Sequence, residues 1–98
     1  MRRRALQKRF FVILHIMKYE IPLKTAGDFS LPALGLGTWS MGGRDLPDPD
    51  NDDERDIAAI REAINLGIIH IDTAEVYSAG HAEELVRTAI ADFPREKL

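Results

Sequence analysis

The sequence predicts an α/β fold in which strands and helices alternate along the chain. Two segments, 52–67 and 82–90, carry apolar residues at the spacing of an amphipathic helix. Between them lies a short apolar run, residues 68–71, which is typical of a parallel strand buried on both faces. The composition, 45% hydrophobic and 30% charged, is that of a globular protein. We therefore expect a hairpin, a strand, a helix, a strand and a helix, in this order.

The N-terminal segment places an apolar run, residues 10–17, behind a cluster of basic residues, as a signal peptide does. The match is poor, because the run contains His15 and Lys18 follows where small cleavage-site residues would stand. The run is also too short to span a bilayer. Met17 opens an ordinary domain start, so we expect residues 1–16 to be an extension that is poorly ordered or upstream of the true start. We expect a cytoplasmic protein with no membrane partner.

A β-hairpin is expected first. Residues 19–23 and 29–34 are strand-like runs, and residues 24–28 between them have the composition of a turn in which Gly27 can take a positive φ. The next strand is expected over residues 34–39.

The glycines of that next strand, Gly35 and Gly37, have two possible roles. They either let another group approach the backbone closely or ease tight packing. They do not open a dinucleotide-binding fingerprint, because Ser40 occupies the third glycine position and an acidic loop follows.

The acidic residues are concentrated in a loop and the helix start after it, residues 45–56. Alternating aspartates at 48–52 resemble a calcium-binding loop, but Asp53 occupies the position of the essential glycine and Ala59 that of the final acid. We therefore expect no metal. The absence of Cys excludes disulfides and thiolate sites. The formal charge of -3 gives no electrostatic reason to expect a nucleic-acid partner.

The first helix is expected to begin near residues 52–56, whose carboxylates suit the positive end of a helix dipole. Ile57, Ile60 and Ile64 form one apolar stripe. Gly67 is expected to end the helix in the C′ position.

The strand that follows carries the strongest functional signal. Strand alternation places His70 on the face of Asp72, and turns Ile69 and Ile71 toward the helices. Asp72 stands where parallel strands carry catalytic groups, at the C-terminal end, although aspartate also caps turns. We interpret His70 as a packed, hydrogen-bonded core histidine rather than a catalyst.

The second helix is predicted from five apolar residues at i, i+3, i+4, i+7 and i+8: Ala82, Leu85, Val86, Ala89 and Ile90. His81 precedes it in a loop, where we expect it to be solvated or to cap the helix. Pro94 ends the helix, and residues 95–98 look like the approach to another strand.

Three motifs occur together in this chain. They are Gly-Leu-Gly-Thr-Trp at 35–39, Gly-Ile-Ile-His-Ile-Asp-Thr-Ala-Glu-Val-Tyr at 67–77 and Gly-His-Ala-Glu-Glu-Leu-Val at 80–86. In combination they resemble the N-terminal third of the aldo-keto reductases. The resemblance implies an N-terminal β-hairpin and the first two βα units of a (β/α)8 TIM barrel, whose complete form needs about 250 residues. Residues 17–98 would then be a partial aldo-keto reductase barrel.

The resemblance also implies an activity: NADPH-dependent reduction of an aldehyde or ketone, a small-molecule carbonyl substrate, to an alcohol. Tyr77 is implied as the proton donor and Asp72 as its supporting carboxylate. A phenol, whose ordinary pKa is about 10, needs a cationic neighbour to act as an acid at neutral pH, and in the family a lysine held by the aspartate provides it. The residues implied at the cofactor and substrate pocket are Gly37, Thr38, Trp39 and Asp72. Trp39 is alternatively a plain packing aromatic.

The chain departs from the family's pattern at two positions, Ser78 and Arg87, where relatives usually have glycine. Ser78 is a mild change. Arg87 puts the local geometry of the second helix in doubt.

Several functional parts of the family lie past residue 98: the lysine after the third strand, a histidine after the fourth, and the phosphate-binding loops. We therefore expect these 98 residues to be inactive alone. The alternative function is a non-catalytic binding module derived from the same barrel. Two parallel strands with open edges invite pairing with other chains, so we expect self-association on either hypothesis.

Overall fold

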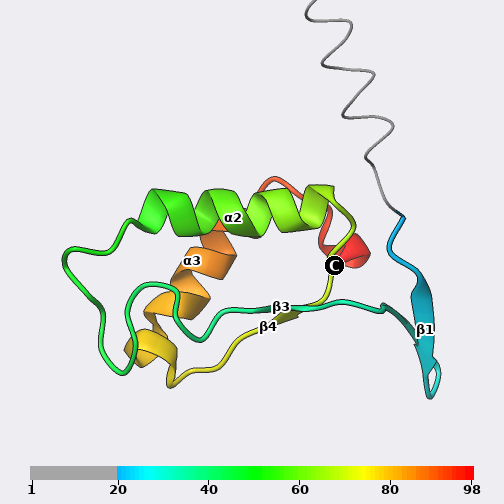
Figure 1. Cartoon of the computed structure of the whole chain (residues 1–98), viewed down its shortest axis with the longest axis horizontal. Helices are drawn as coiled ribbons and strands as arrows, with labels where there is room; N and C mark the ends of the chain where they lie inside the picture. The colour runs from blue at the N-terminus through cyan, green and yellow to red at the C-terminus, as the bar shows by residue number, and fades with distance from the viewer. Residues whose placement is uncertain (1–19) are drawn as a thin grey trace, which may run out of the picture.

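The computed structural model describes residues 20–98, so the expected extension at residues 1–16 lies outside the described residues. The elements are, in order, β1 (Leu23–Ala26), β2 (Phe29–Pro32), β3 (Leu36–Gly37), α2 (Asp53–Asn65), β4 (Ile71–Asp72), the 3-10 helix η1 (Tyr77–Gly80), α3 (His81–Ile90) and the 3-10 helix η2 (Arg95–Lys97). Figure 1 shows the hairpin at one end of the molecule and η1 at the other, with α2 and α3 beside β3 and β4. The predicted order of a hairpin and two strand-helix units is confirmed.

The hairpin differs from the prediction in the bounds of its strands. β1 pairs antiparallel with β2, from Leu23 opposite Pro32 to Ala26 opposite Phe29. The connection is a two-residue turn in which Gly27 has a φ of 60°. Because so short a turn brings the strands together at once, residues 24–26 belong to the first strand and not to the turn, and the expected strand at 19–23 is wrong.

The second sheet is a parallel pair at the centre of the molecule. Leu36 lies opposite Ile71 and Gly37 opposite Asp72, so β3 and β4 end level with each other. The pairing continues one residue past each end, because the Leu36 amide donates to the carbonyl oxygen of His70 (2.8 Å) and the Thr38 amide to that of Asp72 (3.1 Å). Both strands are shorter than the runs predicted at 34–39 and 68–71.

Helix α2 begins and ends on the residues that the sequence predicts. A side-chain oxygen of Asp52 accepts a hydrogen bond from the Arg55 amide (3.0 Å), which satisfies a free donor of the first turn. At the other end Gly67 takes a φ of 93°. The amides of Gly67 and Ile68 then donate to carbonyls of the last helical turn, both at 2.9 Å. This pair of bonds is a Schellman motif, with glycine at the C′ position.

The core lies between the helices and one face of the parallel pair. Its buried cluster consists of Ile60, Ile64 and Ala89, and both Ile69 and Ile71 pack against it, as strand alternation predicts. The opposite face, which carries His70 and Asp72, is exposed. The interpretation of His70 as a packed core residue is therefore wrong for this structure, because its side chain is exposed and borders a cleft.

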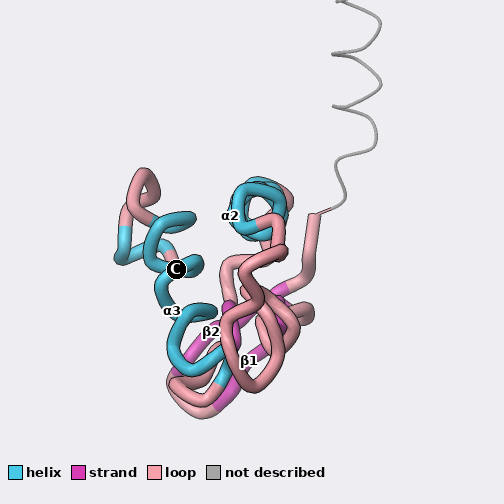
Figure 2. Tube along the Cα trace, turned by 90° about the vertical axis from the view of Figure 1, so that its left-hand side faces the viewer, coloured by secondary structure: helices cyan, strands magenta, loops and turns pink. Residues whose placement is uncertain are grey.

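Helices α2 and α3 contact each other through more than apolar packing. Figure 2 shows α2 nearly end-on with α3 beside it. The Arg61 guanidinium of α2 donates to the carbonyl oxygens of Thr88 and Ala89 in the last turn of α3, both at 3.3 Å. Arg87 is exposed and α3 runs through it without interruption, so this departure from the family does not disturb the helix. No helix within the described residues has the length and apolar character needed to cross a membrane.

The chain after α3 forms η2, a single 3-10 turn, within the residues 95–98 that were interpreted as the approach to another strand. The Arg95 side chain closes this turn by donating to the carbonyl oxygen of Leu98 (3.4 Å). The Leu98 side chain, at the end of this turn, packs on the core.

Candidate active site

The predicted site residues gather where β3 and β4 end. Gly37 and Asp72 are direct partners in the parallel pair, and both are exposed. Trp39 follows two residues after Gly37 and is 62% exposed. Tyr77 opens η1 five residues after Asp72 and is half-buried. The C-terminal ends of parallel strands in α/β proteins are where ligands and catalytic groups lie.

Thr38 lies at this edge and holds the backbone of Asp72 in place. Its side chain is fully buried, and its hydroxyl donates to the carbonyl oxygen of Asp72 (2.9 Å), which also accepts the Thr38 amide (3.1 Å). The hydroxyl proton is thus committed within the protein. Thr38 fixes the backbone of Asp72 from a buried position, whereas the resemblance implied that it lies at the rim of the cofactor and substrate pocket.

The two glycines of the β3 region have different surroundings, which separates the two roles left open by the sequence. A Cβ at Gly35 would lie 3.3 Å from the carbonyl oxygen of His70, so this glycine allows its own segment to pack closely against the segment that leads into β4. A Cβ at Gly37 would meet no atom within 4 Å. The surface above Gly37 is therefore open, and a flat group can approach the backbone there.

The turn that carries Tyr77 is held to the loop after β3. Ser78 is fully buried; its hydroxyl donates to the carbonyl oxygen of Met41 (2.8 Å) and its amide to that of Arg44 (2.6 Å). Ser78 and Ala79 both have left-handed backbone angles, with φ of 50° and 51°. The resemblance to the family implies glycine at the position of Ser78, and a left-handed angle is the conformation that favours glycine.

The groups with the proposed chemistry are not bonded to each other. Within residues 20–98, neither the Asp72 carboxylate nor the Tyr77 hydroxyl takes part in a side-chain hydrogen bond. Next to Asp72, the Thr73 hydroxyl is buried and has no partner among the described residues. A buried hydroxyl of this kind ordinarily has a hydrogen-bond partner.

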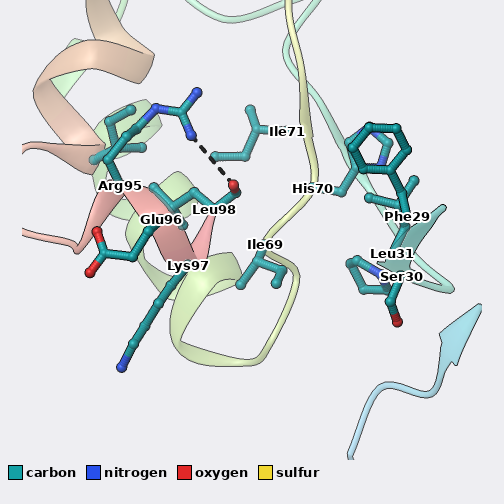
Figure 3. Close-up of a pocket in the computed structure, with 12 residues that line it drawn as sticks. Phe29, Ser30, Leu31, Ile69, His70, Ile71, Arg95, Glu96, Lys97 and Leu98 are labelled. Atoms are coloured by element: carbon teal, nitrogen blue, oxygen red, sulfur yellow. Dashed lines mark hydrogen bonds between the residues drawn. The ribbon is translucent and has the colours of Figure 1, made fainter.

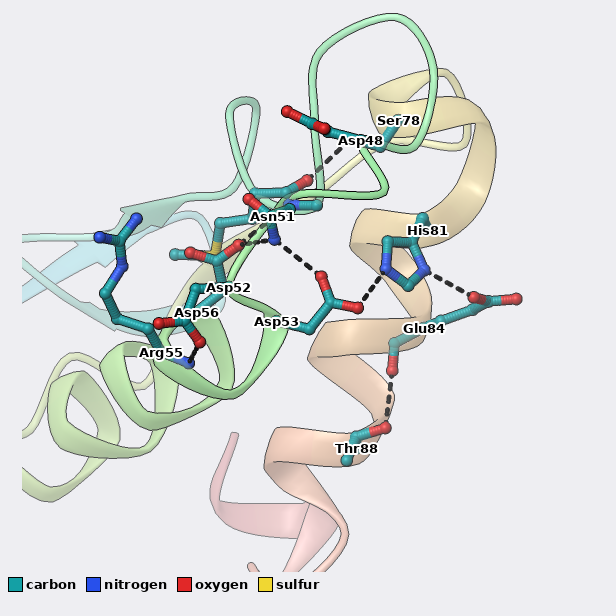
Figure 4. A network of polar contacts seen from close by, with 12 residues as sticks. Asp48, Asn51, Asp52, Asp53, Arg55, Asp56, Ser78, His81, Glu84 and Thr88 are labelled. Atoms are coloured by element: carbon teal, nitrogen blue, oxygen red, sulfur yellow. Dashed lines mark hydrogen bonds and ion pairs between the residues drawn. The ribbon is translucent and has the colours of Figure 1, made fainter.

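A polar cluster behind the loop was not predicted from the sequence. His81 is the first residue of α3, and its Nε2 lies 2.8 Å from an Asp53 oxygen while its Nδ1 lies 2.9 Å from a Glu84 oxygen (Figure 4). Hydrogen bonds to Glu84 and Asp53 raise the pKa of His81, and bonds from Asn51 and His81 lower the pKa of Asp53. The expectation of a solvated or capping loop histidine is wrong. Glu84 is three residues from His81, so helical spacing alone could have predicted that contact. Asp53 is 28 residues away, and no local pattern indicates its contact with His81.

A cleft of about 390 Å³ lies elsewhere, between the hairpin, β4 and η2. Figure 3 shows Phe29 and His70 on one side of it and Lys97 and Leu98 on the other. None of the predicted site residues lines this cleft. We place the candidate site at the strand ends on chemical grounds, because the cleft contains neither Asp72 nor Tyr77.

The acidic loop shows no sign of a metal site in the part of the chain described. No group of three or more His, Asp or Glu side chains within residues 20–98 is arranged to hold a metal ion. The carboxylates are used in other ways. The Asp48 side chain accepts the Asp50 amide (2.9 Å), and Asp56 accepts the Gly42 amide (3.0 Å).

Comparison with known proteins connects these features to one family. The model of the aldo/keto reductase family matches residues 33–98. The chain is 42% identical over 76 residues to methylglyoxal reductase YeaE of Escherichia coli, covering 78% of this chain and 25% of that protein. It is 42% identical over 79 residues to an NADH-specific methylglyoxal reductase of the same organism, covering 81% and 24% respectively. The chain thus spans about a quarter of the length of these relatives.

A solved structure has the same fold over most of the chain. The thermostable aldo-keto reductase Tm1743, determined in complex with the inhibitor epalrestat, matches with a TM-score of 0.74 and 46% identity, over 80% of this chain and 29% of that one. This match confirms the predicted fold class, a hairpin and two βα units of an incomplete (β/α)8 barrel. The chain belongs to the aldo/keto reductase family, a family of oxidoreductases that use nicotinamide cofactors.

Proposed function

We propose that the chain supplies the proton-donating part of an NADPH-dependent carbonyl reductase, with Tyr77 as the acid and Asp72 as its supporting carboxylate. The observation that carries this proposal is the position of Asp72, at the C-terminal end of β4 and level with Gly37 of β3. The turn that begins at Tyr77 follows directly and is fixed through Ser78. Catalytic groups of (β/α)8 barrels lie at this end of the strands.

Reduction of an aldehyde or ketone adds a hydride at the carbonyl carbon and a proton at the carbonyl oxygen. The nicotinamide cofactor, when bound, supplies the hydride. Tyr77 would hold its hydroxyl against the carbonyl oxygen and transfer its proton there, so that the product is an alcohol. A phenol is ordinarily a weak acid with a pKa of about 10, so a neighbouring cation is required, and the Asp72 carboxylate would hold that cation in place.

The described residues fit a nicotinamide ring in three respects. The open backbone at Gly37 allows close approach, since no atom lies within 4 Å of its Cβ position. Trp39, two residues further along the chain, is 62% exposed and could offer its flat apolar ring to a ligand. The Thr73 hydroxyl next to Asp72 is buried without a partner, as expected of a group completed by further chain or ligand. Thr38 would contribute indirectly, through its bonds to the Asp72 carbonyl oxygen.

The substrate and the cofactor form are finer proposals. Two relatives are named methylglyoxal reductases, so we propose a small reactive carbonyl compound as substrate and methylglyoxal as the first to test. We propose NADPH as the reductant, and the NADH-specific relative makes NADH the necessary comparison. The cytoplasmic location stays a prediction.

The direct test places residues 33–98 in a complete barrel, in exchange for the matching segment of the YeaE protein. The chimera should oxidise NADPH in the presence of methylglyoxal. Tyr77→Phe keeps the ring and removes the proton, so it should lower kcat by about 100-fold or more. Asp72→Asn should also lower kcat, whereas Asp92→Asn, the same change at an 85% exposed position, should not. A Tyr77→Phe chimera as active as its parent would rule out the proton-donor role.

The 98 residues alone provide a second test. With NADPH or NADH and methylglyoxal, the purified chain should give no cofactor oxidation above the blank, because the proposed acid needs a cationic neighbour and no ion pair within residues 20–98 brings a Lys or Arg to Asp72. Oxidation that depends on Tyr77 would contradict this expectation.

A non-catalytic binding role is the second candidate, and the cleft between the hairpin and η2 favours it. Phe29, which is 71% exposed, lines the cleft together with Leu98 and the stem of Lys97. An exposed aromatic beside a concave surface is a common feature of binding sites. On this hypothesis, Phe29→Ser would abolish binding of the partner and Tyr77→Phe would leave that binding unchanged. A reductase should instead lose activity in Tyr77→Phe.

A further inference from the structure

His81 has a carboxylate oxygen at each ring nitrogen (Figure 4). A neutral imidazole carries one N–H and can donate to only one of them. Its other nitrogen would then direct a lone pair at the second carboxylate, which is repulsive. The contacts of 2.8 Å to Asp53 and 2.9 Å to Glu84 therefore fit the imidazolium form, in which both nitrogens donate.

The contacts of His81 continue into the loop that follows β3. The second oxygen of Asp53 accepts the Asn51 side-chain amide (2.7 Å), which also donates to Asp56 (2.8 Å). The same Asp56 oxygen accepts the backbone amide of Gly42 (3.0 Å). One chain of hydrogen bonds thus joins the imidazole to the start of α2 and to the loop.

The imidazole ring also lies directly against the loop. Gly42 is buried with a φ of 77°, and a Cβ placed there would stand 2.7 Å from Cδ2 of His81. Met41, directly before Gly42, and Arg44, two residues after it, provide the carbonyl oxygens that hold Ser78. His81 therefore supports the loop from behind, and the loop holds the turn that carries Tyr77.

We propose that His81 is a positioning residue whose doubly protonated ring, held by Asp53 and Glu84, fixes the 41–44 loop and thereby the turn of Tyr77 and Ser78. The order of this turn then depends on pH. When the ring loses a proton, one of its two carboxylate bonds is lost and the support of Gly42 weakens. The proposal goes beyond the reductase function, because the turn is ordered in this way whether or not Tyr77 is an acid.

The charged groups that face His81 all favour its protonated form. Asp53 faces it from α2, with Asp56 behind Asn51, and Glu84 faces it from α3. The loop contributes the uncharged backbone of Gly42. This arrangement agrees in direction with the raised pKa of His81. The turn is therefore expected to be ordered at acidic to neutral pH and to loosen as the pH rises through that raised value.

The test is an NMR titration of the whole 98-residue chain that follows two signals, the His81 ring and the exchange protection of the Ser78 amide. The Ser78 amide is bonded to the Arg44 carbonyl oxygen and so reports on the contact between turn and loop. The protection of Ser78, corrected for intrinsic exchange, should fall by about tenfold as His81 loses its proton, the equivalent of one charge-assisted hydrogen bond. The midpoint for His81 should lie above that of the same chain unfolded in urea.

Variants separate positioning from general stability. His81→Gln should remove the pH dependence of Ser78 protection. Glu84→Gln should move the midpoint of His81 to lower pH. The pH at which the protection of the Ser78 amide falls should move by the same amount. Glu83→Gln is the matched control, since it makes the same charge change in the same first turn of α3 without a His81 contact. Glu83→Gln should change neither the midpoint of the His81 titration nor the pH at which the protection of Ser78 falls.

Two results would overturn the proposal. One is Ser78 protection that stays constant in the unmodified chain while His81 titrates. The other is an unchanged pH dependence in His81→Gln. If that variant does not fold, the unmodified chain and Glu84→Gln decide the question, because the Glu84 side chain is 73% exposed and its loss leaves the core intact.

Discussion

Ser78 combines an unfavourable backbone angle with a favourable buried contact. A left-handed angle costs a residue other than glycine about 1–2 kcal/mol. The buried hydrogen bond from its hydroxyl to Met41 offsets part of this cost. The chain therefore keeps a turn geometry that favours glycine, and adds a side-chain contact that glycine cannot make.

This balance predicts an order of stabilities at position 78. Ser78→Ala loses the hydroxyl bond and keeps the left-handed strain, so it should lower the free energy of unfolding by about 1.5 kcal/mol. Ser78→Gly loses the same bond but relieves the angle, so it should cost less than alanine does. Urea unfolding of the three proteins measures the order. An alanine variant more stable than the glycine variant would contradict the strain.

Single residues differ in how far the sequence alone could place them. Asp72 and Ile71 could be assigned to opposite faces of β4, because alternation along a strand is a local property. The pairing of His81 with Asp53 spans 28 residues and depends on how two helices pack, so no local pattern contained it. The burial of Thr38 was likewise missed, because it depends on the position of the neighbouring strand.

At the scale of elements, the end of α2 depends on a glycine for its backbone angle and not for space. Gly67 has a φ of 93°, and a Cβ there would meet only the Ile21 side chain, at the ordinary contact distance of 3.9 Å. Gly67→Ala should therefore lower the free energy of unfolding by about 1 kcal/mol through backbone strain. The matched control is Gly37→Ala, where no atom lies within 4 Å and no left-handed angle is required.

Thermal or urea unfolding of the two alanine variants tests this difference. Gly37→Ala should match the unmodified chain in stability. In the complete barrel, the same Gly37→Ala variant should raise KM for the cofactor, because the added methyl group occupies the open surface beside Asp72. Equal losses of stability at the two positions would show that the left-handed angle is not the cause.

The contact between α2 and α3 gives the molecule a defined response to pH. Folded His81 binds its proton more tightly than unfolded His81, so its contribution to stability is complete below the ordinary pKa of 6.5 and is lost as pH rises through the raised value. The pKa of Asp53 is lowered from 3.8, so its contribution is present above 3.8 and is lost as pH falls through the lowered value. The difference in unfolding free energy between the unmodified chain and His81→Gln should be greatest between these limits.

Urea unfolding at several pH values measures that difference. Added salt should reduce it, since both partners of His81 are partly exposed. A difference that is constant from acid to alkaline pH would show that His81 contributes by packing alone.

Element boundaries show what sequence patterns do and do not determine. The end of α2 was predicted to the residue, because a glycine after an apolar stripe indicates the left-handed C′ position at which helices end. The first hairpin strand begins four residues and ends three residues later than predicted, since the composition of 24–28 suggested a long turn and Gly27 closes a short one. The register of exposed strands depends on the turn, and a weak apolar pattern could not correct it.

At the scale of the whole molecule, a two-stranded parallel sheet has open edges on both sides. The sheet order is β3 next to β4, with no further strand paired to either within the described residues. Unpaired strand edges can pair with other chains, and the apolar side chains of Leu34 and Trp39, which flank β3 in the sequence, are exposed. We therefore expect the 98-residue chain to self-associate in a concentration-dependent manner in sedimentation experiments.

A matched pair of variants locates this association. Phe29 and Leu46 are both 71% exposed, but only Phe29 lines the cleft beside β4. Phe29→Ser should weaken self-association more than Leu46→Ser does. A monodisperse monomer at all concentrations would show that the open edges are protected.

The architecture of the molecule was predicted more completely than its contacts. The sequence motifs at 35–39 and 67–77 indicated the family, and the match over residues 33–98 confirms it. The family's strands can be recognised in the sequence although β3 and β4 are only two residues long here. The motif residues Gly37 of β3 and Asp72 of β4 identify them. The cleft and the open face with His70 could not be predicted, because they depend on which neighbouring elements are present.

The bonds from α2 to both ends of α3 have a consequence for the order of events during synthesis. Helix α3 has ten residues, and isolated helices of this length are marginal in water. Its first turn is bonded to Asp53 through His81, and its last carbonyl groups are bonded to Arg61. Since a ribosome releases α2 before α3, the earlier helix can serve as the template on which the later one forms. We expect α3 to acquire its structure only after α2 is in place.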